Sequence, residues 1–92
     1  MKGGKNKMSQ YTEYQISEKY YQYKSVIYRI AFSWMGNREE SEDILQNVFL
    51  KWISLCPDFN SEEHEKRWFI RVTINLCKDA HKNFWRKNKH FV

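Results

Sequence analysis

Few residues in this 92-residue chain have the types and spacing that catalysis requires. The letters HEKRW, residues 64–68, begin like the HExxH helix of a zinc protease, but Trp68 stands where the second histidine must be. There is no GxSxG motif, no glycine-rich phosphate loop and no carboxylate pair enclosed by apolar residues. We therefore predict that the protein is not an enzyme and uses no cofactor.

A metal site is the remaining chemical possibility. Cys77 and His81 are four residues apart on one helical face, and Cys56 or His64 could complete a ligand set across the fold. Cys77 points towards the expected core, so we prefer a packed thiol there and predict no bound metal. The two cysteines form neither a CxxC pair nor a multi-bridge framework, and both should be reduced.

The polar residues of the last third of the chain have a spacing that suits a nucleic acid strand. At about 100° per residue they share one side of a helix, with Trp68 and Trp85 at its borders. This face, which we call the basic rail, contains Arg71, Asn75, Lys78, Lys82, Arg86 and Lys89. A face exposed only to water usually mixes charges, whereas the rail has five cations, one amide and no acid. It therefore favours phosphate binding, with the aromatic borders available to bases.

A second unusual face lies in the stretch SEDILQNVFLKW, residues 41–52. On a helix, several polar residues and one leucine point together, with Phe49 and Ile53 along the edge: Asp43, Gln46, Asn47, Leu50 and Ser54. Carboxylates near a helix start are favoured by the helix dipole, which accounts for the acids but not for an exposed leucine. The face therefore predicts a protein contact.

Three helices are needed to position these two faces. The first is predicted from Ile16, because apolar residues recur at steps of four and three, and Gly36 ends it. Asn37 and Glu40 have the form of a capping box for the second helix, which Pro57 ends. Its buried stripe should contain Ile44, Leu45, Val48, Phe49, Trp52 and Leu55. A polar loop then leads into an acidic start of the third helix near Asn60 or Ser61.

Length and composition predict one small all-α domain. Hydrophobic residues make up 41% of the chain and aromatic residues 17%, which is enough for a packed core, while one proline and little alternation give sheets no support. We expect a bundle of three main helices over 16–87, a flexible tail over 1–15 and the start of a linker over 88–92.

The net charge of +5 is distributed unevenly along the chain. Residues 1–37 carry six Lys or Arg against two acids, 38–65 two against eight, and 66–92 eight against one. A basic pole and an acidic middle imply two different partners. There is no signal peptide pattern and no 18-residue apolar run, so we expect a cytoplasmic protein with no membrane partner.

Two stretches together resemble region two of the extracytoplasmic-function sigma factors, small members of the sigma-70 family of bacterial transcription initiation factors. They are YRIAFSWMGNREESEDILQNVFLKW and, after the loop, RWFIRVTINLCKDAHK. The resemblance covers about residues 20–82. It implies an all-helical domain that binds core RNA polymerase and recognises and melts the minus-ten promoter element.

The resemblance also implies roles for particular residues. The helix with the EDIxQ signature would dock on the clamp helices of the beta-prime subunit through Asp43, Gln46, Asn47, Phe49, Leu50 and Ile53. The helix from Trp68 would meet the non-template strand of promoter DNA, and the loop 57–65 would receive a base swung out of that strand. The DNA-binding set is then Phe59, Trp68, Arg71, Asn75, Lys78, Lys82 and Arg86.

The chain departs from the family pattern in places. Ser41 replaces the usual alanine before the acidic pair, a change expected to matter little at a helix surface or edge. His81 and Lys82 stand where the family often has leucine and arginine, so the resemblance is weaker at the end of the protein helix that would contact DNA. No second helix-turn-helix domain follows, and we interpret the chain as a fragment and not as a one-domain variant.

Three alternatives remain at this stage. A sigma-like interaction module would bind polymerase or an anti-sigma factor without promoter recognition, and the basic rail would then have no role. A repressor of double-stranded DNA would need a tight turn between two short helices, and the loop after Cys56 is too long for one. A metal enzyme is the third.

Overall fold

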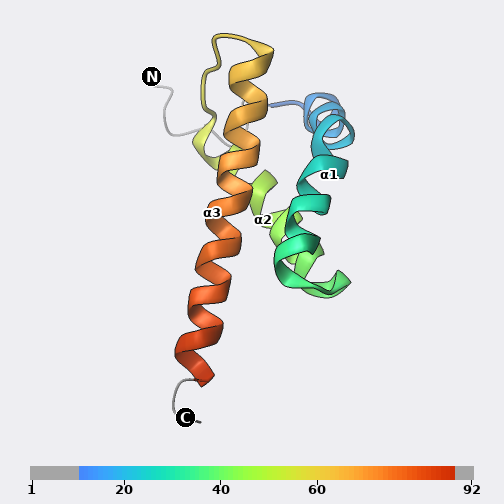
Figure 1. Cartoon of the computed structure of the whole chain (residues 1–92). Helices are drawn as coiled ribbons and strands as arrows, with labels where there is room; N and C mark the ends of the chain where they lie inside the picture. The colour runs from blue at the N-terminus through green and yellow to red at the C-terminus, as the bar shows by residue number, and fades with distance from the viewer. Residues whose placement is uncertain (1–10, 89–92) are drawn as a thin grey trace.

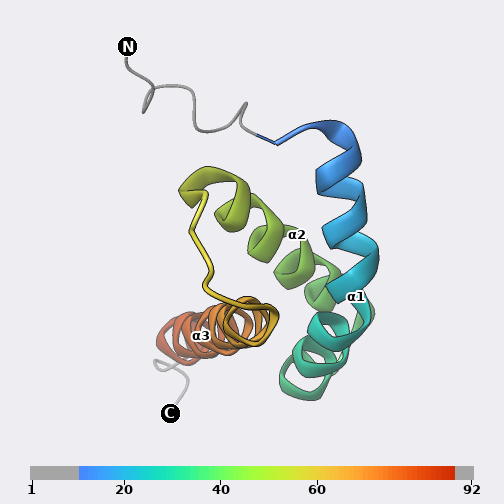
Figure 2. The ribbon, with the colours of Figure 1, turned by 90° about the horizontal axis from the view of Figure 1, so that it is seen from above.

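The computed structural model describes residues 11–88, with side chains described for residues 11–82. This part of the chain forms three helices, α1 (Glu13–Met35), α2 (Arg38–Leu55) and α3 (Glu62–Asn88), and no strand (Figure 1). The predicted all-α bundle of three main helices is confirmed. Viewed from above, α3 is seen along its axis with α1 and α2 beside it (Figure 2).

The first helix starts earlier than the predicted Ile16. The Thr12 hydroxyl accepts a bond from the Gln15 backbone N–H at 3.1 Å, and the Gln15 side chain accepts one from the Thr12 N–H at 2.9 Å. This capping box satisfies two amides of the first turn and fixes the start at Glu13. Residues 12–15, which were assigned to the predicted tail, thus form the N-cap and the first turn of α1. Residues 1–10 of that tail and most of the predicted linker lie outside the described residues, and the domain boundaries stay a prediction.

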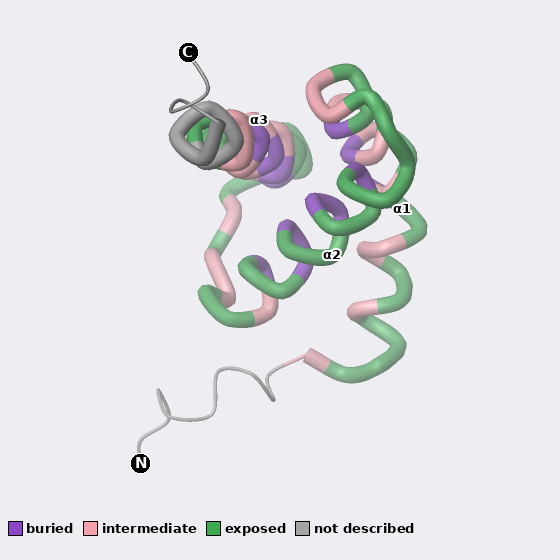
Figure 3. Tube along the Cα trace, turned by 90° about the horizontal axis from the view of Figure 1, so that it is seen from below, coloured by how far each residue is buried: buried purple, intermediate pink, exposed green. Residues whose placement is uncertain are grey.

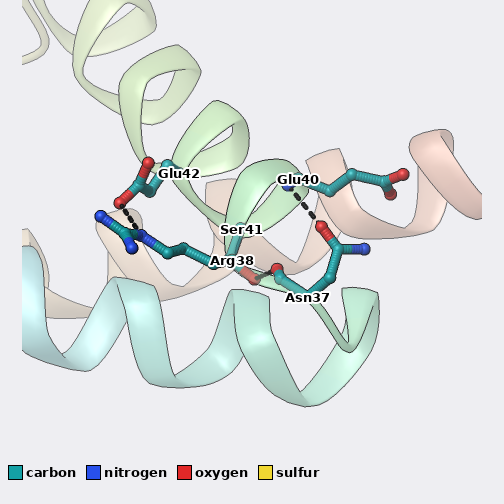
Figure 4. A network of polar contacts seen from close by, with 5 residues as sticks. All are labelled: Asn37, Arg38, Glu40, Ser41 and Glu42. Carbon is teal, nitrogen blue, oxygen red and sulfur yellow. Dashed lines mark hydrogen bonds and ion pairs between the residues drawn. The ribbon is translucent and has the colours of Figure 1, made fainter.

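Only Gly36 and Asn37 separate α1 from α2. Gly36 adopts φ 78°, a left-handed conformation that glycine takes without a side-chain clash, and its N–H donates to Phe32 O at 2.9 Å. The Asn37 side chain accepts from the Glu40 N–H at 2.9 Å (Figure 4). Figure 4 shows the Glu40 carboxylate pointing away from Asn37. Only the asparagine half of the predicted capping box therefore forms.

Ser41 lies inside the fold, which corrects the expectation of a surface or edge position. It is fully buried, and its hydroxyl donates to the Asn37 carbonyl at 2.6 Å. A buried hydroxyl needs such a partner. Leu55 is a second correction, because it was predicted in the buried stripe and is 49% exposed in the last turn of α2.

The second helix ends at Leu55, and Cys56 caps it just before Pro57. Cys56 has φ 45°, and its N–H donates to Trp52 O at 2.9 Å. The chain then crosses to α3, where the Ser61 hydroxyl accepts from the His64 N–H at 3.1 Å and satisfies an amide of the first turn. The loop thus brings the start of α3 back beside α1 and α2, as Figure 2 shows.

The core lies between the three helices, on the inward faces coloured as buried in Figure 3. Phe69 of α3 is at its centre, fully buried, with ring centroids 4.5 Å from Tyr23, 5.4 Å from Phe49 and 5.9 Å from Trp52. These contacts join α1 and α2 to α3 through aromatic packing. The other buried apolar residues are Ile27, Ala31, Ile44, Leu45, Val48 and Cys77.

Candidate functional site

A groove of about 1050 Å³ runs between α1 and α2. No side chain of α3 up to Lys82 contributes to it. Its α1 wall contains Tyr20, Lys24, Ser25, Tyr28, Arg29, Phe32 and Ser33, and its α2 wall contains Glu42, Leu45, Gln46, Phe49, Leu50 and Ile53. The groove combines aromatic and aliphatic surface with cations on the α1 wall and a carboxylate on the α2 wall, which is a composition suited to another protein.

Leu50 is the prominent apolar residue beside this groove. It is 52% exposed, although it is a large aliphatic side chain on a helix with a well-filled core stripe. Gln46, one turn earlier, is exposed and lines the groove with it. Asp43 and Asn47 are exposed as predicted but do not line the groove, and Ile53 is half-buried at its end. The predicted face therefore exists as an exposed surface.

Phe49 was predicted both in the buried stripe of α2 and at the edge of the contact face; its burial is confirmed, and its exposed edge position is wrong. Its side chain is only 6% exposed, because Tyr20 of α1 and Phe69 of α3 pack against the ring at centroid distances of 5.2 and 5.4 Å. Phe49 contributes to the floor of the groove and to the core instead of to the exposed face.

The basic rail is exposed where the structure describes its side chains. Arg71, Asn75, Lys78 and Lys82 are all exposed, and their spacing of three or four residues keeps them on one side of α3. None of the three cations forms an ion pair with a described residue. The side chain of Arg86 and all of Lys89 lie outside the described side chains, as does Trp85.

Aromatic side chains gather where the loop enters α3. The Phe59 ring is 5.8 Å from Trp68 and 5.3 Å from His64, edge to face in both pairs. Phe59 and Trp68 are both half-buried, so part of each ring stays accessible. The two predicted base-contacting aromatics therefore lie together, one helical turn before Arg71.

A second hollow, of about 430 Å³, lies on the other side of the loop. It is lined by Tyr11, Lys19, Trp52, Pro57, Asp58, Phe59, Asn60, Ser61, Glu62 and Glu65. Tyr11 stacks on Trp52 with ring centroids 4.2 Å apart and planes 17° apart. Tyr11 was not among the predicted site residues, because no local pattern connects it to a helix that ends more than forty positions later.

A buried ionic cluster closes the wall of this hollow. Glu65 is 7% exposed and accepts hydrogen bonds from Lys19 Nζ at 2.9 Å and from the Tyr23 hydroxyl at 2.8 Å. Burial raises the pKa of Tyr23, and its hydrogen bond to Glu65 adds to this shift, so the phenol stays neutral and donates. This cluster joins the first turn of α3 to the middle of α1.

The chain is similar to known proteins over most of its length. The Sigma-70 region 2 family matches residues 20–90 of the chain. The protein belongs to this family. The sequence is 31% identical over 67 residues to the RNA polymerase sigma factor SigV of Bacillus subtilis, covering 73% of this chain and 38% of that protein. It is 32% identical over 57 residues to the ECF RNA polymerase sigma factor SigW of the same species, covering 62% of this chain and 30% of that protein.

This region 2 domain thus spans about a third of the length of the curated relatives it matches, 38% of one and 30% of the other. No solved structure matches it significantly. The predicted resemblance to the extracytoplasmic-function sigma factors is confirmed. The family match starts at residue 20, so Tyr11 and Lys19 of the second hollow lie ahead of it.

The side chains considered above as metal ligands make contacts with the protein itself. Cys77 is fully buried, and burial raises the pKa of its thiol. His81 Nε2 lies 2.6 Å from the Trp34 carbonyl oxygen, and His64 Nδ1 accepts from the Asn60 N–H at 3.1 Å. Among the side chains of residues 11–82, no three His, Cys, Asp or Glu residues are grouped as metal ligands. None of the three helices, over the residues described, is long and apolar enough to cross a membrane.

Proposed function

We propose that this region 2 domain is part of a cytoplasmic sigma factor. It binds core RNA polymerase through the exposed α2 face around Leu50 and holds the melted non-template strand of the minus-ten promoter element along α3. One observation carries the proposal: two different surfaces lie on different helices of one small domain. On α2 a half-exposed leucine lies beside the groove, and on α3 there is a row of exposed cations without an acid.

The polymerase contact is supported by the character of the α1–α2 groove. A clamp helix of the beta-prime subunit is an amphipathic partner, and a helix in a groove is a common recognition mode. Leu50 would be the central apolar anchor, while Gln46, Asp43 and Asn47 supply polar contacts around it. Ile53 and the buried Phe49 would contribute apolar surface at the groove floor.

The DNA contact is supported by the rail and by the neighbouring aromatics. Arg71, Lys78 and Lys82 can follow consecutive phosphates, and Asn75 lies between them where an amide can contact a base edge. Trp68 and Phe59 offer partly exposed rings to unstacked bases. Stacking on such a ring contributes about 1 to 3 kcal/mol per base, which is comparable with the cost of unstacking, so the domain traps melted DNA with the help of polymerase.

The proposal is tested by pull-down with core RNA polymerase, using two matched variants of the full chain. Leu50→Asp and Leu55→Asp change equally exposed leucines of α2, at 52% and 49%, but only Leu50 lines the groove. Leu50→Asp should weaken polymerase binding by about tenfold or more, as expected at the centre of an interface, and Leu55→Asp should leave it nearly unchanged. Equal retention of both variants would contradict the assigned interface.

The alternative, a polymerase-binding or anti-sigma-binding module without promoter recognition, predicts the same pull-down result. The two hypotheses differ in the role that they give to the basic rail. If the domain does not touch promoter DNA, replacing Arg71 and Lys78 by Met should not change the retention of a minus-ten single strand by the polymerase complex. Our proposal requires a clear loss. Binding of a purified anti-sigma factor would be tested with the same leucine pair.

A further inference from the structure

We propose that His81 is a positioning residue for DNA binding, which holds the C-terminal part of the basic rail in place by capping the end of α1. The bond that does this joins His81 Nε2 of α3 to the Trp34 carbonyl oxygen of α1, and the two atoms are 2.6 Å apart. This inference rests on the proposed function, because it requires that a single strand lies along α3. It adds a residue that acts on DNA binding without touching DNA.

The end of α1 needs a donor from outside its own helix. The Trp34 carbonyl is one of the last four of α1, and these have no amide partner within the helix. The Phe32 carbonyl, two residues earlier, is satisfied by the Gly36 N–H at 2.9 Å. The last turn of α1 contains no basic residue. His81 therefore supplies from α3 the kind of side chain that stabilises a helix C-terminus, where basic residues can bond the last carbonyls.

Two contacts fix the orientation of the His81 ring. A carbonyl oxygen can only accept a hydrogen bond, so Nε2 carries a proton and donates it to Trp34. The Trp34 ring also packs against the imidazole edge to face, with centroids 5.4 Å apart and planes at 86°. A leucine, which the family often has at this position, could pack here but could not donate the bond.

His81 lies where α3 leaves the core. Among the described side chains, Cys77 is the last of α3 that is fully buried. After it Ala80 and His81 are half-buried, while Lys78 and Lys82 are exposed. Figure 1 shows the last turns of α3 running past the ends of the other two helices. Of the hydrogen bonds between described residues, the bond from His81 is the one nearest the C-terminus that ties α3 to another helix.

The two ends of the described rail are thus held by different contacts. Arg71 lies between Phe69 and Thr73, which are both fully buried, so the core fixes its position. Lys82 follows His81 directly and is about 16 Å further along the helix axis. Without the bond, the end of α3 can open locally and move away from α1. Its cations then no longer contact the phosphates of a strand that Arg71 holds.

The first test needs no DNA and measures amide hydrogen exchange by NMR in the full chain. The matched variants are His81→Ala, which removes the donor, and His81→Gln, which keeps an N–H donor on the side chain. His81→Ala should speed exchange at the Lys82 amide about tenfold or more, as expected when one carbonyl loses its partner, and His81→Gln should stay close to the wild type. Protection at the Phe69 amide shows that each variant is folded. Unchanged exchange at Lys82 in His81→Ala, or equal exchange in the two variants, would overturn the anchor.

The second test measures the binding of a single strand of about 12 thymidines by fluorescence anisotropy, in the range that small single-strand sites cover. The slope of log affinity against log salt is about −0.7 per phosphate contact. Lys82→Met should remove one contact from the wild type but almost none from His81→Ala, where this lysine is already displaced. Arg71→Met should remove one contact in both backgrounds, because the core holds Arg71.

The outcomes separate this inference from the proposed function. An equal loss of slope from Lys82→Met in the two backgrounds would overturn the positioning role of His81 and leave the rail in place. A wild-type slope near zero would overturn the DNA part of the proposed function, and the positioning role with it. The exchange measurement decides in either case whether His81 anchors the end of α3.

Discussion

Neutralising one rail lysine should reduce the salt dependence of single-strand binding by a definite amount. The described rail offers three exposed cations, Arg71, Lys78 and Lys82, which span eleven helical steps, or about 16 Å of helix axis. If each contacts one phosphate, the slope of log affinity against log salt is about −0.7 per contact, or about −2 in total. A fourfold rise in salt should then weaken binding by roughly 18-fold.

Lys78→Met removes the middle cation and should change the slope to about −1.4, so that the same rise in salt costs only about sevenfold in affinity. Lys51→Met is the matched control, because Lys51 is an exposed lysine of α2 and its replacement changes the net charge equally. Fluorescence anisotropy over a range of salt concentrations measures both slopes. A wild-type slope near zero, or equal slopes for the two variants, would refute the assignment of the rail to phosphate binding.

Three further predictions concern stability and can be measured on the purified domain. Glu65→Leu leaves the buried Tyr23 hydroxyl without its acceptor and should lower the free energy of unfolding by about 1 to 3 kcal/mol in urea titrations; an unchanged midpoint would show that this cluster adds nothing. The pKa of Tyr23 is raised in the fold above its ordinary 10.0, so its contribution is fully present below about pH 10 and is lost as the pH rises further; Tyr23→Phe should unfold less steeply in alkali than the wild type. Asn37→Ala removes the acceptor for the Glu40 N–H and should cost about 1 kcal/mol of stability. Arg38→Ala breaks only an exposed ion pair and should lower the melting temperature less than Asn37→Ala does.

The three helices, and the set of residues on the rail face of the third one, could be predicted from the sequence because both depend on local geometry. The periodicity of a helix fixes which side chains share a face, and Gly36, Asn37 and Pro57 mark its ends by their own backbone preferences. The exposed position of Leu50 followed from the same periodicity, since it lies opposite the centre of the apolar stripe. These parts of the fold needed no knowledge of how the helices pack.

The errors lie where packing decides. Phe49 was assigned both to the buried stripe and to the edge of the contact face, and only its packing against Tyr20 and Phe69, from two other helices, decides for burial. Ser41 is buried because the start of α2 packs closely on the end of α1, which a single helix pattern does not indicate. Leu55 is exposed because the chain turns away at the end of α2.

The second hollow could not be predicted for a related reason. Tyr11 meets Trp52, and Lys19 meets Glu65 across 46 positions, so neither contact leaves a local signal in the sequence. Glu65 itself looks like an ordinary acid in the first turn of a helix. The capping box of Thr12 and Gln15 was the available sign that the chain is already ordered before Ile16.

The connection between α1 and α2 consists of only two residues, each of them tied to a helix end. At this end the walls of the groove can therefore move apart only if these contacts break. An incoming helix meets a receptor whose width is already set, and little conformational entropy is lost when it docks. Lengthening this connection by one or two glycines would leave every groove side chain in the protein and should still weaken the complex.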